Sequence, residues 1–233
     1  MTIMRLHHLP DTAVLEVLRV LEPEFAELSE AAALALRHGV PDLALRWALA
    51  AGQNGLAAAA ALRLGFTGQA LDLTQTLPDD ARRAVLIARA CSLGGDPSLS
   101  WAEQARALAR QEGDAPALIA AVTLLGELRL TEPRAALRTL AEGLKVAEMV
   151  GEAADAHLLA VLAHAQARAG GRSKSLKTAQ KSLERSPQRS PARIWALLAL
   201  GQTEQAGVQR RAGQLDERWF VRARLRGVVE ELS

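Results

Sequence analysis

The histidines are the residues of this sequence best suited to metal or acid–base chemistry, and they occur mainly in two places. His157 and His164 share one face of a predicted helix, but they stand about 10 Å apart along its axis, too far to hold one zinc ion together. His7 and His8 lie near the start of the chain, close to Asp11, in a terminus with few other ordering signals. We therefore predict no metal site.

Nucleophilic and nucleotide-dependent chemistry has little support. The only cysteine, Cys91, lies in an apolar stretch typical of a buried small side chain. The chain lacks the GxSxG nucleophile turn, the GxxxxGK[ST] phosphate loop and the GxGxxG dinucleotide fingerprint. We predict that the protein is not an enzyme and uses no cofactor.

Composition favours a helical protein with a continuous core. The 233 residues are 49% hydrophobic, mostly alanine and leucine, with no tyrosine. The first residues carry charges and Pro10 where a signal peptide needs an apolar run, and no segment reaches membrane-spanning length. A lone cysteine cannot form an internal disulfide. We expect a cytoplasmic protein without a membrane contact.

Glycine and proline divide the chain into helical segments. Segments of about 12 to 18 residues with helical apolar spacing alternate with short breaks such as RHGVPD, LGFTG, SLGGDPS, QEGDAP and RAGGRS. None has the alternation of a strand. The pattern predicts about eleven helices in antiparallel hairpins.

Similar hairpins recur along the chain. Residues 79–114, 115–152 and 153–187 each follow a pattern of helix, short turn and helix at nearly equal length, which is the mark of a helical repeat array. We divide the array into irregular hairpins at residues 1–76, the clearest repeats at 77–189, and a last repeat with a capping helix at 190–233.

The clearest repeat resembles the tetratricopeptide repeat family. From Ala156 onward, packing and turn residues occupy the positions that this family favours: Leu159, Leu162, Ala163, Gly170, Leu176, Ala179, Leu183 and Pro187. The Leu125-Gly126 and Leu200-Gly201 pairs resemble its first-helix signature. The resemblance implies an all-α fold, an α-α superhelix or solenoid of antiparallel hairpins, which binds protein or peptide partners on its concave face.

A second resemblance, to a more specific family, rests on three stretches within residues 30–206: RHGVPDLALRWALAAGQ, LDLTQTLPDDARRAVLIARA and WAEQARALARQEGD. This region is similar to the helical sensor regions of large LuxR-type and maltose-regulator-type transcription factors, without their nucleotide-binding module or C-terminal helix-turn-helix. It implies a scaffold in a regulatory system, and it leaves a small-molecule sensor as a third hypothesis.

The family resemblance also implies which side chains face a partner. The first helix of each hairpin supplies the residues of the concave face. We expect this face to bind an acidic or carboxylate-ended peptide; the alternative is that its side chains are simply solvated. The residues are Arg82, Arg89, Thr123, Glu127, His157, His164, Arg168, Trp195 and Gln202.

A basic face is predicted on the second helix of the clearest repeat. Lys174, Lys177, Lys181 and Arg185 fall within an arc of about 80°, opposite Leu176, Ala179 and Leu183, which should pack inward.

Charge is also divided between the two parts of the chain. Residues 1–165 carry 14 basic and 20 acidic side chains, whereas residues 166–233 carry 14 and 6. The basic face could be a solvated surface, a nucleic-acid site, a contact for an acidic protein, or a contact for a second copy packed head to tail.

The last segment, LDERWFVRARLRGVVEELS, is predicted to be a helix. Its apolar face would hold Val221, Leu225, Val228, Val229 and Leu232, with Trp219 and Phe220 projecting elsewhere. These aromatic side chains either wrap back over the last repeat as part of a cap or form a dimer or partner contact.

Overall fold

Alanine and leucine, which have high helix propensity, fill most of the elements of this protein. In the computed structural model, residues 10–224 are described, and every regular element among them is helical. The elements in chain order are α1 (Asp11–Val20), η2 (Phe25–Glu27), α2 (Leu28–Arg37), α3 (Pro41–Ala50), α4 (Asn54–Leu64), α5 (Thr67–Thr74), α6 (Ala81–Gly94), α7 (Leu99–Glu112), α8 (Ala115–Leu128), α9 (Pro133–Met149), α10 (Ala156–Arg168), α11 (Arg172–Arg185), α12 (Pro191–Ala199), α13 (Thr203–Ala212), η3 (Glu217–Phe220) and α14 (Val221–Arg224).

The prediction of an all-α protein is thus confirmed for the described residues, but the expected number of helices was too low. The first five helices contain only 8 to 11 residues each. They are shorter than the segments expected from the sequence, so the chain turns more often than predicted.

The turn signals act as helix boundaries. The side chains of Asp80, Asp114, Asp155 and Ser190 each accept a hydrogen bond from a backbone N–H in the first turn of a helix. Gly65 ends α4 with a φ of +83°, a conformation that only glycine adopts without strain.

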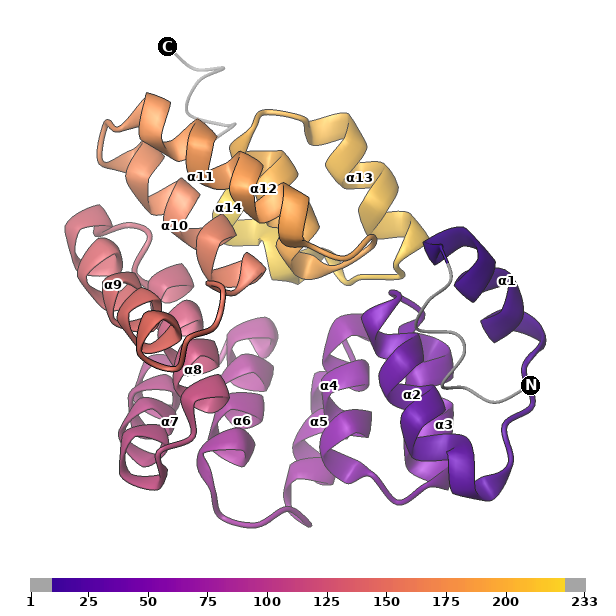
Figure 1. Ribbon diagram of the computed structural model, residues 1–233. Helices are drawn as coiled ribbons and strands as arrows, with labels where there is room; N and C mark the ends of the chain where they lie inside the picture. Colours follow the sequence, from indigo (N-terminus) through magenta and orange to yellow (C-terminus); the bar gives the residue numbers. More distant parts are fainter. Residues whose placement is uncertain (1–9, 225–233) are drawn as a thin grey trace.

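The helices follow one another along a curved path (Figure 1), and the inner ones line a pocket, which we call the opening. From α2 to α13, each helix packs against the next one in the chain. The even-numbered helices from α2 to α12 also pack against one another in succession, and they line the opening. The odd-numbered helices lie mainly outside them. Consecutive hairpins therefore form an inner and an outer layer.

Glycine allows the closest helix contacts in this arrangement. A Cβ atom on Gly126 of α8 would lie 2.5 Å from Leu140 of α9, and one on Gly143 of α9 would lie 2.8 Å from Val122 of α8. Because glycine has no side chain, α8 and α9 can approach this closely at both positions.

The packing face of α11 differs from the predicted one. Ala179 is buried and Leu183 is partly buried, as expected, but Leu176 is 41% exposed. The buried stripe also contains Ser175 and Ser182, and it is rotated about 60° from the predicted one. Small side chains let α11 approach α10 closely, and Ser182 Oγ donates a hydrogen bond to the Ala156 carbonyl at 2.6 Å.

The C-terminal part of the described chain returns to the first helices. We call residues 213–222 the closing segment. The Asp216 N–H donates to the Arg63 carbonyl at 2.8 Å, Arg218 donates to the Gly65 carbonyl at 2.6 Å, and Trp219 Nε1 donates to the Leu62 carbonyl at 2.8 Å. These bonds join the end of the array to α4, so the opening is closed on itself.

A second contact joins the same two ends. Arg189, between α11 and α12, donates to the His38 carbonyl at 2.9 Å and to Asp11 Oδ2 at 2.5 Å. His38 Nδ1 lies 2.7 Å from the other oxygen of Asp11. Asp11, which we considered as a metal ligand, is therefore held in an ion pair, while His7 and His8 lie outside the described residues.

The aromatic side chains of the closing segment are packed against the protein. Phe220 is fully buried, and Trp219 packs against both the N-terminal and the C-terminal hydrophobic clusters. Trp219 therefore reaches beyond the last helices to α4. Leu225, Val228, Val229 and Leu232 lie outside the described residues. Within the described part, no helix combines the length and apolarity needed to cross a membrane.

Candidate functional site: the central pocket

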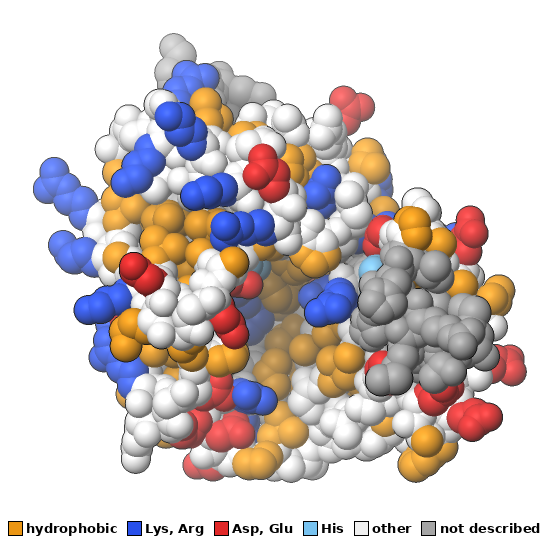
Figure 2. All heavy atoms as spheres, in the orientation of Figure 1, with side chains coloured by type: hydrophobic (Ala, Val, Ile, Leu, Met, Phe, Trp, Pro, Cys, Tyr) orange, Lys and Arg blue, Asp and Glu red, His pale blue; other side chains and the backbone are white. Residues whose placement is uncertain are grey.

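A pocket of about 650 Å³ lies where the inner helices face one another. It draws its lining from α2, α4, α6, α8, α10 and α12, together with Trp219 and the loop before α10. Figure 2 shows it as a hollow with mostly apolar walls in the middle of this face. We call it the central pocket. Because helices from the whole chain converge there, it is the natural candidate for a ligand site.

The innermost polar group of the site is a buried ion-pair cluster. Arg89 donates to both carboxylate oxygens of Glu127, at 2.6 and 2.7 Å, and His157 Nε2 lies 2.9 Å from Glu127 Oε1. Glu127 is only 1% exposed. Burial alone would raise the pKa of Glu127, but the charge and hydrogen bonds of Arg89 and the bond from His157 outweigh it and lower the pKa to about 2.

Aromatic rings surround this cluster. The Arg89 guanidinium lies 4.5 Å from the ring centroid of Trp219. The His157 ring centroid lies 6.0 Å from that of Trp195 and 6.5 Å from that of Trp219. Arg89 is therefore fixed by a carboxylate and an aromatic face, and the cluster gives the pocket a rigid wall.

A different arginine on the pocket wall has no acidic partner. Arg63 of α4 donates to the Leu36 carbonyl at 2.5 Å, and no carboxylate of the described residues pairs with it. Burial lowers the pKa of Arg63 to about 10. Arg37, which is exposed at the same side of the pocket, also forms no ion pair within the described chain. This side therefore carries positive charge without a counter-ion.

Carboxylates lie on the loop before α10. Glu152 and Asp155 line the pocket there, and Asp155 Oδ1 also accepts hydrogen bonds from the first N–H groups of α10. The pocket thus has a basic side at α2 and α4 and an acidic side at this loop, with apolar residues between them.

The predicted concave residues do not form one surface. Arg89, Thr123 and His157 line the central pocket. Glu127, His164 and Trp195 are buried behind it, with His164 Nε2 2.9 Å from the Trp195 carbonyl oxygen.

The other three predicted residues lie elsewhere. Arg168 bonds to the carbonyls of Leu130 and Arg222. Arg82 is exposed and pairs with Asp114 at 2.6 Å, and Gln202 is exposed at the start of α13. The role of all nine residues in partner binding stays a prediction.

The residues of the predicted basic face, Lys174, Lys177, Lys181 and Arg185, are all exposed, and none forms an ion pair within the described chain. What they bind stays a prediction.

Sequence reasoning missed the two most distinctive features of the pocket. Arg63 was visible only as the charge that interrupts the apolar run LAAAAALRLG. Trp219 was expected to wrap back over the last repeat or to form a dimer or partner contact, but its place beside α4, more than a hundred residues away in the chain, was not predicted.

A larger hollow of about 1050 Å³ lies on the outer side, between α7 and α9. Two of its arginines are committed to internal pairs, Arg106 with Glu142 at 2.5 Å and Arg129 with Glu103.

No group of three or more His, Cys, Asp or Glu side chains within residues 10–224 is placed to hold a metal ion. No protein-family model matches the chain, and a comparison with curated proteins finds no significant match.

Proposed function

We propose that this protein is a non-catalytic binding scaffold of the tetratricopeptide type, a right-handed superhelix of hairpins that holds the carboxylate-bearing end of a peptide partner in its central pocket. In this proposal the carboxylate lies against Arg63 and Arg37, and apolar side chains of the peptide contact the walls. The partner would belong to a regulatory system, as the resemblance to regulator sensor regions suggests.

The observation that carries this proposal is Arg63, whose guanidinium has a carbonyl partner but no carboxylate partner among the described residues. A buried guanidinium without a carboxylate is costly, and its cost falls when an anion enters the pocket. The other central cation, Arg89, is already neutralised by Glu127. An anionic group on the ligand therefore complements the α2–α4 side of the pocket better than any other group.

The closing segment favours a peptide end over an extended peptide. Trp219 and the residues around it occupy part of the inner face. A pocket of about 650 Å³ remains, and its size lies within the range of cavities that enclose small ligands. A few residues at a chain end fit such a space.

The size of the pocket also supports a second candidate, a small organic acid with an apolar body. Here the protein would be a sensor whose ligand carries the same carboxylate chemistry. The two candidates differ in the source of the carboxylate, and one experiment can distinguish them.

The experiment measures binding of short fluorescent peptides with apolar last residues, each prepared with a free and with an amidated C-terminus, and of medium-chain aliphatic and aryl carboxylic acids. We expect the free carboxylate to bind at least about tenfold more tightly than the amide, because a charged hydrogen bond is lost in the amide. Preference for the organic acids alone would identify the sensor.

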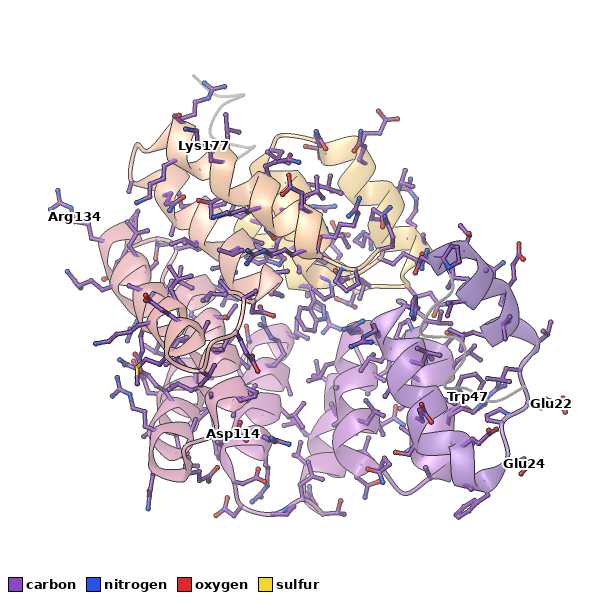
Figure 3. All side chains as sticks on the ribbon, in the orientation of Figure 1. Glu22, Glu24, Trp47, Asp114, Arg134 and Lys177 are labelled. Carbon is purple, nitrogen blue, oxygen red and sulfur yellow. The ribbon has the colours of Figure 1, made fainter. Side chains whose placement is uncertain are left out.

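Matched variants decide whether the pocket is responsible. Arg37→Glu reverses an exposed charge at the pocket, and Arg134→Glu reverses an exposed charge on the outer end of α9 (Figure 3). The proposal requires the first change to abolish carboxylate-dependent binding and the second to leave it intact. It is wrong if no carboxylate ligand binds, or if both variants bind as the wild type does.

A further inference from the structure

A second concave surface lies on the outside of the molecule, away from the central pocket. It is a groove of about 600 Å³, which we call the α9–α11 groove. Its lining has three parts: an apolar wall from α9 with Leu137, Ala141 and Leu144; a floor with Ala154, Leu159, Leu162 and Gln166; and a wall from α11 with Lys174, Thr178, Lys181 and Arg185. In Figure 2, apolar side chains gather below a row of basic ones at this place.

The charges of the groove are not balanced by the chain itself. None of the described residues that line it is acidic. Lys174 and Lys181 are exposed and form no ion pair with the described residues, while Arg185 donates a hydrogen bond to the Ala154 carbonyl at 3.1 Å. The groove therefore offers cations beside an apolar wall on which Ala141 is exposed and Leu137 and Leu144 are partly exposed.

The floor also contains an unsatisfied polar atom. The side-chain oxygen of Gln166 is buried and accepts no hydrogen bond. Buried polar atoms in native proteins nearly always have a partner. An occupant that brings a donor to this floor would complete the hydrogen bonding of Gln166.

An acidic surface, opposite in charge to the groove, lies between α1 and α2. We call residues 20–27 the acidic segment. Val20 is 80% and Phe25 is 79% exposed, more than any other large apolar side chain of the described residues. Glu22 and Glu24 are exposed beside them, form no ion pair within the described chain, and project outward in Figure 3.

We infer that the α9–α11 groove of one molecule binds the acidic segment of a second copy. Glu22 and Glu24 then pair with Lys174 and Lys181, and the apolar residues at the two ends of the segment cover the leucines of the groove. The acidic segment then loses the exposed apolar area of Val20 and Phe25, and the groove loses the part of Leu137 and Leu144 that a single molecule leaves accessible.

The dimensions of the two surfaces agree. The row from Lys174 to Arg185 runs along eleven residues of helix, about 16 Å. The chain from Val20 to Phe25 spans at most about 17 Å when extended. Leu21 and Glu24, which lie on either side of Glu22 and Pro23, have extended backbone angles. The acidic segment can therefore lie along the whole basic row.

The contact must be head to tail. The acidic segment lies at the α1 side of the molecule and the groove at the α9 and α11 side (Figure 1), so one molecule cannot fill its own groove. Each copy offers a groove to one neighbour and a segment to another. Such a contact produces a ring or an open chain of molecules.

Nucleic acid fits the groove less well than this occupant. Phosphates would pair with the lysines, but the leucine floor and wall would gain no cover, and no aromatic side chain lines the groove for base stacking. A duplex would therefore use the positive charge of the groove but not its apolar lining.

The test is the oligomeric state of the full chain, measured by sedimentation velocity and light scattering over a wide range of protein concentration. One variant combines Glu22→Lys with Glu24→Lys, another combines Lys174→Glu with Lys181→Glu, and the control is Lys177→Glu. Lys177 is exposed on the same helix but does not line the groove. All five side chains are exposed, and circular dichroism checks that the folds agree.

We expect the wild type and the control to assemble as concentration rises and to dissociate in high salt. Each double variant should stay monomeric, with the self-association constant at least about tenfold weaker, because attractions become repulsions. A mixture of the two double variants should assemble again, with the variants in alternation, because the native groove of one fits the native segment of the other and the two reversed surfaces are also complementary. Combining all four changes in one chain should restore assembly.

Three results would overturn the inference: a wild type that stays monomeric throughout, a mixture of the two double variants that does not assemble, or a control as defective as the double variants. If the wild type stays monomeric and binds a labelled DNA duplex, and this binding is lost in the Lys174→Glu and Lys181→Glu variant, the groove is a nucleic-acid surface instead.

Discussion

Replacing Glu127 by glutamine removes the negative charge at the centre of the molecule while keeping the shape of the side chain. Arg89 then stays partly buried beside an amide, without its counter-ion. In the folded protein the pKa of Glu127 lies near 2, against an ordinary value of 4.5. A difference of this size corresponds to about 3 kcal/mol of stability, which agrees with the cost of about 3 to 5 kcal/mol for breaking a buried ion pair.

The pH dependence has a defined sign. Because the folded state lowers the pKa of Glu127, its contribution is fully present above pH 4.5 and is lost as the pH falls toward about 2. We therefore expect Glu127→Gln to be about 3 kcal/mol less stable than the wild type at neutral pH. The difference should shrink steadily below pH 4.5.

The assay is urea unfolding followed by circular dichroism, at neutral pH and at several acidic values. Asp79→Asn is the control, because Asp79 forms an ion pair with Arg83 while 86% exposed, and exposed pairs contribute little. Changing Arg89 to Met together with Glu127 to Leu should recover most of the loss, because neither member of the Arg89–Glu127 pair is then left without its partner. A deficit below about 1 kcal/mol, or one that stays equal at acidic pH, would refute the reasoning.

Three further predictions concern other parts of the fold. Gly126→Ala should destabilise the protein by about 1 to 3 kcal/mol because its Cβ would lie 2.5 Å from a leucine, whereas Gly68→Ala, which meets nothing within 4 Å, should stabilise it slightly in the same thermal unfolding assay. Cys91 should react more slowly with a thiol reagent in the folded than in the unfolded protein at neutral pH, because burial, together with the nearby Asp96 charge, raises its pKa; equal rates would contradict this. Asp11→Asn should weaken the contact with Arg189 and lower the melting temperature. For Asp11, burial opposes ionisation but the hydrogen bonds from His38 and Arg189 outweigh it, so its pKa lies below 3.8 and the deficit should fade as the pH falls below that value.

Local signals predicted the all-helical class and several helix boundaries, because each depends on neighbouring residues, although they gave too few helices. Asp80 and Asp114 mark helix starts, and Gly65 marks an end. The face of α11 was predicted less well, because apolar periodicity gives weight to large residues such as Leu176. The actual contact uses Ser175 and Ser182, whose small size permits close approach.

The candidate site was predictable only in part. Arg89 and His157 follow from their place on first helices, and both line the central pocket. The hydrogen bond from Trp219 to Leu62 joins residues 157 positions apart. No pattern within a helix or hairpin carries information on such a contact, so neither the closure nor the shape of the pocket could be read from periodicity or composition.

The closing segment changes how the protein should come apart. In an open array of hairpins the terminal units have one neighbour each, so they fray first and independently. Here Asp216 and Trp219 tie the last helices to α4, and Arg189 ties them to Asp11. Release of either end breaks the same bonds. Amide hydrogen exchange in α2 and in α12 should therefore speed up together when the contacts of Asp216, Trp219 and Arg189 are removed. This is the behaviour of a closed ring of helices, whereas the two ends of an open array would exchange independently.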